Sequence, residues 1–428
     1  MRHFTYKNLD ELRQSCSALG AEHVRFEPDP ARVRAILARP VRVAAIDVGN
    51  SIAIHPMEGC DGALDGNPGD LTIRRYQRFA ASGAKLVWFE ATAVTAEGRA
   101  NPRQLWLHPG NLASYASLLE QFRSIHREQF GSSDDLLEPL QLTHSGRYSS
   151  PRRIIACHNP LVDARFNTPP DYPVITDDEI ERLEEAYIET ARLGLAAGFR
   201  AVDVKATHGY LANELLGAKQ RPGRYGGSLE NRTRFLRNIL GKLRSEFGTQ
   251  LILAMRLGCF DGIPYQVPSG RPYDHEIPYD HGFGVNPLNP LEADLTDVKA
   301  AIAGFRAAGL DLLNVSLGCP YYNPHVGRPF EMPDAGNYEQ PEHPLLGVNR
   351  HFGIAGELQR AFPDLPMVGT GYSWLQTYSI NAAAANLDSG AIRFFGLGRG
   401  ALAHPDFARE ALDHGQLDER RVCKTLTY

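Results

Sequence analysis

The feature that most constrains the fold is an alternation of short apolar segments with longer amphipathic ones, repeated about eight times along 428 residues. The short segments are rich in β-branched and aromatic residues, as strands are. They lie at 51–57, 85–91, 139–145, 200–206, 251–257, 310–316, 366–370 and 391–397. Eight strand–helix units predict an α/β protein of the (β/α)8, or TIM, barrel class, with a closed inner sheet of parallel strands.

Several of the intervening segments carry helix boundary signals. Thr176 and Glu179 form a capping box ahead of a long amphipathic stretch. Ser228 is a suitable N-cap for the segment 229–247, and Gly309 is a suitable stop for the segment 294–309. These boundaries support helices where a barrel requires them.

The chain divides into three parts on this interpretation. Residues 1–40 are polar and form an N-terminal extension, residues 41–415 form the barrel, and residues 416–428 form a C-terminal tail. A stretch from 260 to about 290, rich in Gly, Pro, Asp and Tyr, follows the fifth strand. We expect it to stand over the active face as a lid or wall.

Charge and cysteine content exclude several classes of function. The net charge of −5 gives no electrostatic case for nucleic acid, and no apolar run is long enough to span a membrane. The N-terminus lacks an apolar signal core, which favours a cytoplasmic protein. The cysteines occur singly, which argues against a metal site or an iron–sulfur cluster; they are Cys16, Cys60, Cys157, Cys259, Cys319 and Cys423. The oligomeric state stays open, a homo-oligomer included.

The carboxyl ends of the predicted strands carry polar residues and glycines, and this is where barrels place their chemistry. The stretches are HPMEG (55–59), EATAV (90–94), QLTHSGR (141–147), KATHGY (205–210), Arg256, GTGYS (369–373) and GLGRG (396–400). Glycine turns after strands seven and eight are where barrels bind phosphate on backbone N–H groups. Arg399 adds a forked cation suited to the same anion.

Together these stretches resemble the motifs of the old yellow enzyme family, which are flavin-dependent ene-reductases on an FMN-binding barrel. The resemblance covers residues from about 50 to 410 and is closest to the single-domain form without an iron–sulfur cluster. Its most specific part is HGYL (208–211) followed by YGGSLENR (225–232). It also includes PM (56–57), EATAV with EGR (97–99), QLTHSGR, Arg256 and GLGRGALAHPDF (396–407).

The resemblance implies a site for non-covalent FMN. Pro56, Met57, Glu58 and Ala91 would flank the flavin ring, and Gln141 would bind its pyrimidine edge. Arg256 would place positive charge beside the reduced flavin. The phosphate would lie on Gly371, Gly398 and Arg399.

The resemblance also implies the reaction. NADH or NADPH would reduce the flavin, which would pass hydride to the β-carbon of an α,β-unsaturated carbonyl compound. His208, with Lys205, would bind the carbonyl oxygen, and Tyr210 would give a proton to the α-carbon. Tyr321, Tyr322 and His325, after the sixth strand, are candidates for the wall of a pocket for a small-molecule substrate.

Three residues depart from the family pattern. Lys205 stands where a His is usual, Glu58 where a small or neutral residue is usual, and Arg393 where Asp is common. An anion at position 58 would oppose flavin reduction. These departures leave the substrate and the direction of the reaction open.

Other functions fit parts of the same pattern. A lysine at the end of a central barrel strand is how aldolase-type lyases form Schiff bases, and Lys205 has that position. A flavin-dependent desaturase or demethylase could use the same groups. A non-catalytic flavin-binding protein is the third alternative.

Overall fold

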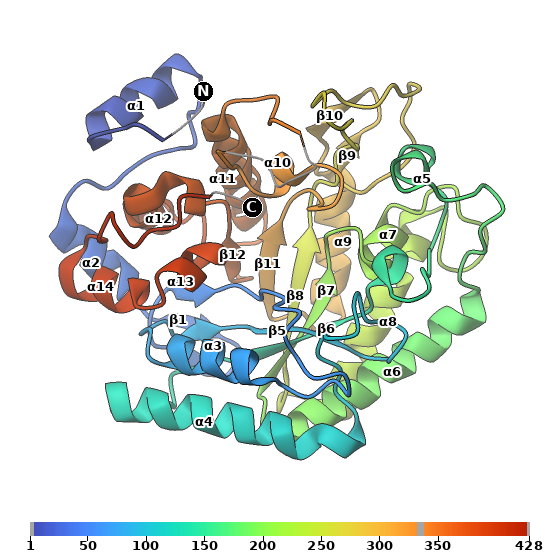
Figure 1. The fold of residues 1–428 in the computed structure, drawn as a ribbon, viewed down its shortest axis with the longest axis horizontal. Coiled ribbons are helices and arrows are strands. Elements are labelled where there is room, and N and C mark those ends of the chain that lie inside the picture. The colour runs from blue at the N-terminus through green and yellow to red at the C-terminus, as the bar shows by residue number, and fades with distance from the viewer. Residues whose placement is uncertain (1–3, 332–337, 426–428) are drawn as a thin grey trace.

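The computed structural model, which describes residues 4–331 and 338–425, has a central barrel of parallel strands surrounded by helices (Figure 1). Each strand pairs in parallel with its neighbours in the order β4-β3-β13-β12-β11-β8-β7-β6-β5. The strands are β3 (Ile52–Ile54), β4 (Leu86–Val87), β5 (Phe89–Ala93), β6 (Pro139–Thr143), β7 (Ala201–Ala206), β8 (Ile252–Gly258), β11 (Leu312–Ser316), β12 (Met367–Gly369) and β13 (Phe394–Leu397).

The two edges of this sheet belong to one interrupted strand. Only Trp88 separates β4 from β5, and its N–H donates to the carbonyl of Ile54 at 3.0 Å. The sheet therefore closes on itself as an eight-stranded barrel. The predicted fold class is confirmed, and each predicted strand segment contains a barrel strand.

A long helix follows each barrel strand. These helices are α3 (Asp70–Ala80), α4 (Leu112–Phe130), α6 (Asp177–Ala196), α8 (Leu229–Phe247), α9 (Thr296–Ala307), α11 (Pro344–Ala361), α12 (Ser379–Asp388) and α14 (Phe407–His414). The capping box at Thr176 forms in full, and Ser228 caps α8 by accepting from the N–H of Asn231. Gly309 follows α9 with a φ of +107°, which a side chain would strain.

A hairpin closes the amino-terminal end of the barrel, and the sequence interpretation did not include it. Its strands β1 (Val41–Val43) and β2 (Ile46–Val48) pair antiparallel. Val43 and Val48 are fully buried in a cluster that includes Trp88, which lies in the barrel wall. Because the hairpin fills the amino-terminal end of the barrel, a cavity within the barrel can open only at the carboxyl ends of the strands.

Residues 4–40 pack on the outside of the barrel. Helix α2 (Pro30–Leu37) lies against α12 and α14, and α1 (Leu9–Ala18) precedes it. The boundary of this extension stays a prediction.

The loop after β8 contains a hairpin of β9 (Val285–Asn286) and β10 (Asn289–Ala293). None of the helices within the described residues combines the length and apolar character needed to cross a membrane.

Shorter helices decorate the loops at the strand ends. They are α5 (Pro160–Phe166), α7 (Leu211–Leu216), α10 (Pro324–Gly327) and α13 (Arg399–Ala403), with 3-10 turns η1 (Pro109–Asn111), η2 (Gly146–Tyr148) and η3 (Ser373–Tyr378). Two of them matter for the site: α7 begins directly after Tyr210, and α13 begins directly after Gly398.

Candidate active site

A cavity of about 650 Å³ opens at the carboxyl ends of the barrel strands. That volume is within the range of small-molecule and cofactor sites. All but two of the site residues predicted from sequence line it, and these come from eight different barrel strands or the loops that follow them. They are Pro56, Met57, Glu58, Ala91, Gln141, Lys205, His208, Tyr210, Arg256, Tyr321, Gly371, Gly398 and Arg399.

The other two predicted residues, Tyr322 and His325, lie away from this cavity. Tyr322 lines a smaller, separate cavity together with Asp261. The Nδ1 atom of His325 lies 2.8 Å from the hydroxyl of Tyr338, and the imidazole packs edge-on against Tyr265. The chain turns into α10 after Tyr321, and Pro324 and Gly327 of that helix line the cavity while Tyr322 and His325 do not.

Tyr210, Glu58 and Lys205 meet in the cavity wall. The Tyr210 hydroxyl donates to Oε2 of Glu58 at 3.0 Å and lies 3.2 Å from the Tyr321 hydroxyl. The ammonium of Lys205 donates to the same Glu58 oxygen at 3.3 Å and lies 3.5 Å from the centre of the Tyr210 ring. One carboxylate oxygen therefore serves both a phenol and a cation.

Burial sets the protonation of these groups. It raises the pKa of the Tyr210 phenol well above the ordinary value, and the Glu58 carboxylate raises it further, so the phenol keeps its proton at neutral pH. Burial lowers the pKa of Lys205, and the nearby Glu58 carboxylate opposes that shift. Lys205 and Glu58 form an ion pair in the cavity wall, with 3.3 Å between Nζ and Oε2.

His208 holds a left-handed backbone conformation with a φ of +66°, which is uncommon outside glycine. Its Nε2 lies 3.4 Å from the hydroxyl oxygen of Ser316. Burial lowers the pKa of His208 well below its ordinary value, and the charges of Arg256 and Lys205 lower it further. The imidazole is therefore neutral and has one N–H to donate.

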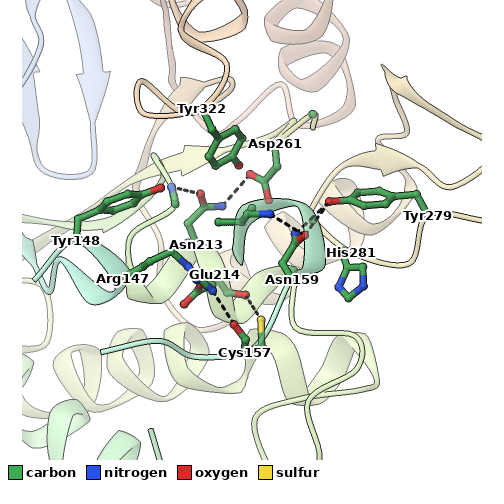
Figure 2. A pocket seen from close by; sticks show the side chains of 15 residues that line it. Arg147, Tyr148, Cys157, Asn159, Asn213, Glu214, Asp261, Tyr279, His281 and Tyr322 are labelled. Atoms are coloured by element: carbon green, nitrogen blue, oxygen red, sulfur yellow. Dashed lines mark hydrogen bonds and ion pairs between the residues drawn. The ribbon is translucent and has the colours of Figure 1, made fainter. Parts of the chain in front are cut away.

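Two side chains missed by the sequence interpretation fix the 207–210 loop from behind. Asn213 accepts a hydrogen bond from the N–H of Gly209 at 2.7 Å and donates to Oδ1 of Asp261 at 3.0 Å, as Figure 2 shows. The other oxygen of Asp261 accepts from the N–H of Phe283 at 2.7 Å. This chain of contacts joins the loop that carries His208 and Tyr210 to the long loop after β8. No sequence pattern marked either residue.

A second group of polar residues lies on strands β6, β7 and β8. Gln141 donates its amide to Oδ2 of Asp203 at 2.5 Å, so its carbonyl oxygen is the atom it can offer to the cavity. Arg256 donates from Nη1 to the carbonyl of Pro56 at 3.2 Å, and its Nε is buried without a hydrogen-bond partner among the described residues. Burial lowers the pKa of Arg256 to about 10 although Asp203 opposes the shift.

The glycine turns complete the cavity. Gly371 has a φ of +92°, and a Cβ there would come within 2.8 Å of His351, so the position requires glycine. Gly398 is the N-cap of α13, and Arg399 is the first residue of that helix. No group of three or more His, Cys, Asp or Glu side chains among the described residues could hold a metal ion.

Comparison with known proteins identifies the family of this chain. The family described as NADH:flavin oxidoreductase / NADH oxidase matches residues 37–267, more than half of the chain. The chain belongs to that family. An NADPH dehydrogenase of Geobacillus sp. is 29% identical over 274 residues, which cover 62% of this chain and 73% of that enzyme. An NADPH dehydrogenase of Halalkalibacterium halodurans is 31% identical over 208 residues, which cover 47% of this chain and 58% of that enzyme.

Solved structures agree on the fold. An old yellow enzyme homologue from Zymomonas mobilis aligns with a TM-score of 0.62 at 21% identity, over 88% of this chain and 92% of that chain. A 2-naphthoyl-CoA reductase aligns with a TM-score of 0.67 at 20% identity, over 89% of this chain but 52% of that chain. Identities this low establish the shared barrel alone.

As a member of the NADH:flavin oxidoreductase / NADH oxidase family, the chain is an NAD(P)H-dependent oxidoreductase with FMN as its cofactor. The residues of the cavity fit that cofactor. The Nε of Arg256, which has no hydrogen-bond partner in the described part of the chain, is a buried cationic donor. The Gln141 carbonyl is an acceptor suited to a flavin N–H. Arg399 and the backbone of two glycine turns are suited to its phosphate.

The three departures from the family pattern occupy different places. Glu58 and Lys205 pair with each other inside the cavity. Arg393 is exposed on the way into β13, where its side chain reaches toward the carbonyl of Pro363, so it does not line the cavity. Two of these three residues therefore form one ion pair in the cavity wall, and the third lies outside the cavity.

Proposed function

We propose that this enzyme reduces the C=C bond of an α,β-unsaturated carbonyl compound, with Tyr210 as the proton donor and with His208 and Lys205 as donors to the carbonyl oxygen. When bound, FMN supplies the hydride that it receives from NADH or NADPH. The observation that carries the proposal is the meeting of a protonated phenol and two nitrogen donors in the same cavity as Arg256 and Gln141.

The nitrogen donors can stabilise the negative charge that the reaction creates on the carbonyl oxygen. Adding hydride to the β-carbon builds negative charge on the carbonyl oxygen, and preorganised donors stabilise that charge. The Lys205 ammonium has three N–H groups, of which Glu58 occupies one. Neutral His208, which lines the same cavity, contributes a further N–H.

Tyr210 suits the role of acid. Its phenol is protonated at neutral pH, and its oxygen lies within hydrogen-bonding distance of Glu58 and Tyr321. Delivery of the proton requires the O–H to turn from Glu58 toward substrate, and Lys205 beside the ring stabilises the phenolate that remains.

The alternative functions, a Schiff-base lyase and a flavin-dependent desaturase or demethylase, would use the same residues of the cavity. Lys205 is buried and its pKa is lowered, which a Schiff-base lyase also needs. Membership of a flavin oxidoreductase family and the contact of Lys205 with Glu58 favour the redox function. Desaturation or demethylation would use the same donors with hydride passing to the flavin.

The proposal is tested on purified holoenzyme without air. NADPH or NADH should bleach the flavin absorbance, and 2-cyclohexen-1-one should restore it while cyclohexanone appears in equal amount. A flavin that stays reduced in the presence of excess enone would overturn the proposal. Inactivation by borohydride with a carbonyl ligand, with the adduct on Lys205, would favour the lyase.

A further inference from the structure

The loop that carries Glu58 holds its carboxylate in the part of the cavity that is lined by Lys205 and Tyr210. The N–H of the next residue, Gly59, donates to Oε2 of Glu90 at 2.7 Å. Glu90 is fully buried and contacts Arg75, which also donates to Asp61 at 2.6 Å. The backbone beside Glu58 is therefore anchored to the start of β5. The Glu58 carboxylate faces Lys205 and Tyr210.

Lys205 and Glu58 form a pair of opposite charges at this end of the cavity. Lys205 is 4% exposed and Glu58 is 16% exposed by side chain, with 3.3 Å between Nζ and Oε2. Beside them lie the neutral hydroxyls of Tyr210 and Tyr321 and the neutral imidazole of His208. The charges of Arg256 and Asp203 also act on Lys205, and their effects have opposite signs. A lysine alone would attract a carboxylate, but this lysine is already paired.

We propose that Glu58 makes this site selective for uncharged carbonyl compounds and excludes substrates that carry a carboxylate near the reacting bond. The reaction itself rests on the function proposed above, but the charge selectivity rests only on the position of the Glu58–Lys205 pair. Lys205 then acts as a donor to a neutral oxygen rather than as an anchor for an acid.

Coulomb interactions set the size of the effect. An anion that approached Lys205 would also come within a few ångströms of the Glu58 carboxylate, so the attraction and the repulsion would nearly cancel. The cost of removing the anion from water would remain. A neutral carbonyl oxygen avoids that cost and still finds an N–H of Lys205. At the effective dielectric of a partly buried site, removing one charge at this distance changes anion affinity by about tenfold to a hundredfold.

The first test measures binding and needs no turnover. Benzoate and the uncharged benzamide are titrated into the oxidised holoenzyme, and the change in flavin absorbance reports binding. Glu58→Gln should tighten benzoate binding at least tenfold relative to benzamide. Glu97→Gln is the matched control, because it removes the same charge from an exposed side chain of the loop after β5, and it should leave the ratio unchanged. In Glu58→Gln/Lys205→Met the gain should disappear.

The second test measures selectivity in turnover with 4-oxopent-2-enoate and its methyl ester, which share the enone and differ in the charge of the carboxyl group. The acid-to-ester ratio of kcat/KM should rise at least tenfold in Glu58→Gln. An unchanged benzoate-to-benzamide ratio in Glu58→Gln, or in Glu58→Ala if the first variant does not fold, would overturn the inference. If neither enone is turned over by the wild type, the proposed reaction fails while the benzoate result still decides the charge selectivity.

Discussion

The hydroxyl of Tyr210 and the carboxylate of Glu58 lie 3.0 Å apart although the two residues are 152 positions apart in the sequence. The same Glu58 oxygen accepts from Lys205. The acid proposed for the reaction is thus in contact with an anion whose own partner is a cation. A change at Glu58 or Lys205 should therefore alter both the free energy of unfolding and the reaction proposed for Tyr210.

Lys205→Met should destabilise the protein because it leaves the Glu58 carboxylate in the cavity wall without its cation. We expect a loss of about 2 kcal/mol in the free energy of unfolding, measured by urea denaturation at saturating FMN. Glu58→Gln/Lys205→Met should recover at least half of it. Lys299→Met, which breaks a surface pair with Glu357, should cost less than about 1 kcal/mol. Equal losses in the two lysine variants would contradict the account.

Asn213→Ala should slow turnover without removing the cofactor. The change leaves the N–H of Gly209 without its partner and releases the 207–210 loop from Asp261. We expect about a tenfold fall in kcat with an enone, equivalent to roughly 1.4 kcal/mol, at an unchanged ratio of flavin to protein. The control is Asn238→Ala, which removes an amide that donates to Glu184 on the outside of the barrel. A full kcat in Asn213→Ala would show that the contact does not position the loop.

Arg256→Met should weaken the hold on the flavin and make it harder to reduce. The variant removes a buried cation whose Nε has no partner among the described residues. We expect FMN affinity to fall at least tenfold and the two-electron midpoint potential to fall by about 30 mV, equivalent to roughly 1.4 kcal/mol. Arg256→Lys keeps the charge and should retain most of the potential. A potential that is the same in Arg256→Met and the wild type would place Arg256 away from the flavin.

The pH dependence of stability should reveal the burial of Asp203. Burial raises the pKa of its carboxyl to about 6, against the hydrogen bond from Gln141 and the charge of Arg256. The folded state therefore binds this proton more tightly than the unfolded state. The contribution of Asp203 to stability should fall as pH rises from about 4 to about 6.

Asp203→Asn removes that dependence and keeps an acceptor for Gln141. The advantage of the variant over the wild type in unfolding free energy should grow by about 3 kcal/mol across this pH range. The measurement is urea denaturation of both proteins at several pH values with saturating FMN. A difference that does not change with pH would mean that the carboxyl titrates normally.

The barrel was predictable because strand and helix signals are local. Each of the eight apolar segments contains a barrel strand, and the caps at Thr176 and Ser228 form as the pattern indicated. The β1–β2 hairpin was missed because each of its strands has three residues and its burial comes from closing the barrel end. Nothing in the sequence around Trp88 signals the break between β4 and β5.

Most residues that line the cavity were predictable, because the carboxyl ends of barrel strands meet at one face. The ion pair between Glu58 and Lys205 inside the cavity was not predictable. Glu58 and Lys205 could each have found another partner, and only the three-dimensional positions of two loops bring them together. Tyr322 and His325 were placed in the cavity wall because they adjoin Tyr321, but the turn into α10 directs them elsewhere. The catalytic roles of Tyr210 and His208 stay predictions.

The most direct test of the central claim is the effect of Tyr210→Phe on the two half-reactions, followed by stopped-flow absorbance without air. Flavin reduction by NADPH should stay within about threefold of the wild-type rate. Reoxidation of the reduced enzyme by 2-cyclohexen-1-one should slow at least a hundredfold, because a positioned general acid contributes about 10²–10⁴-fold. Equal loss in both half-reactions, or no loss in the second, would contradict the assignment of Tyr210 as the proton donor.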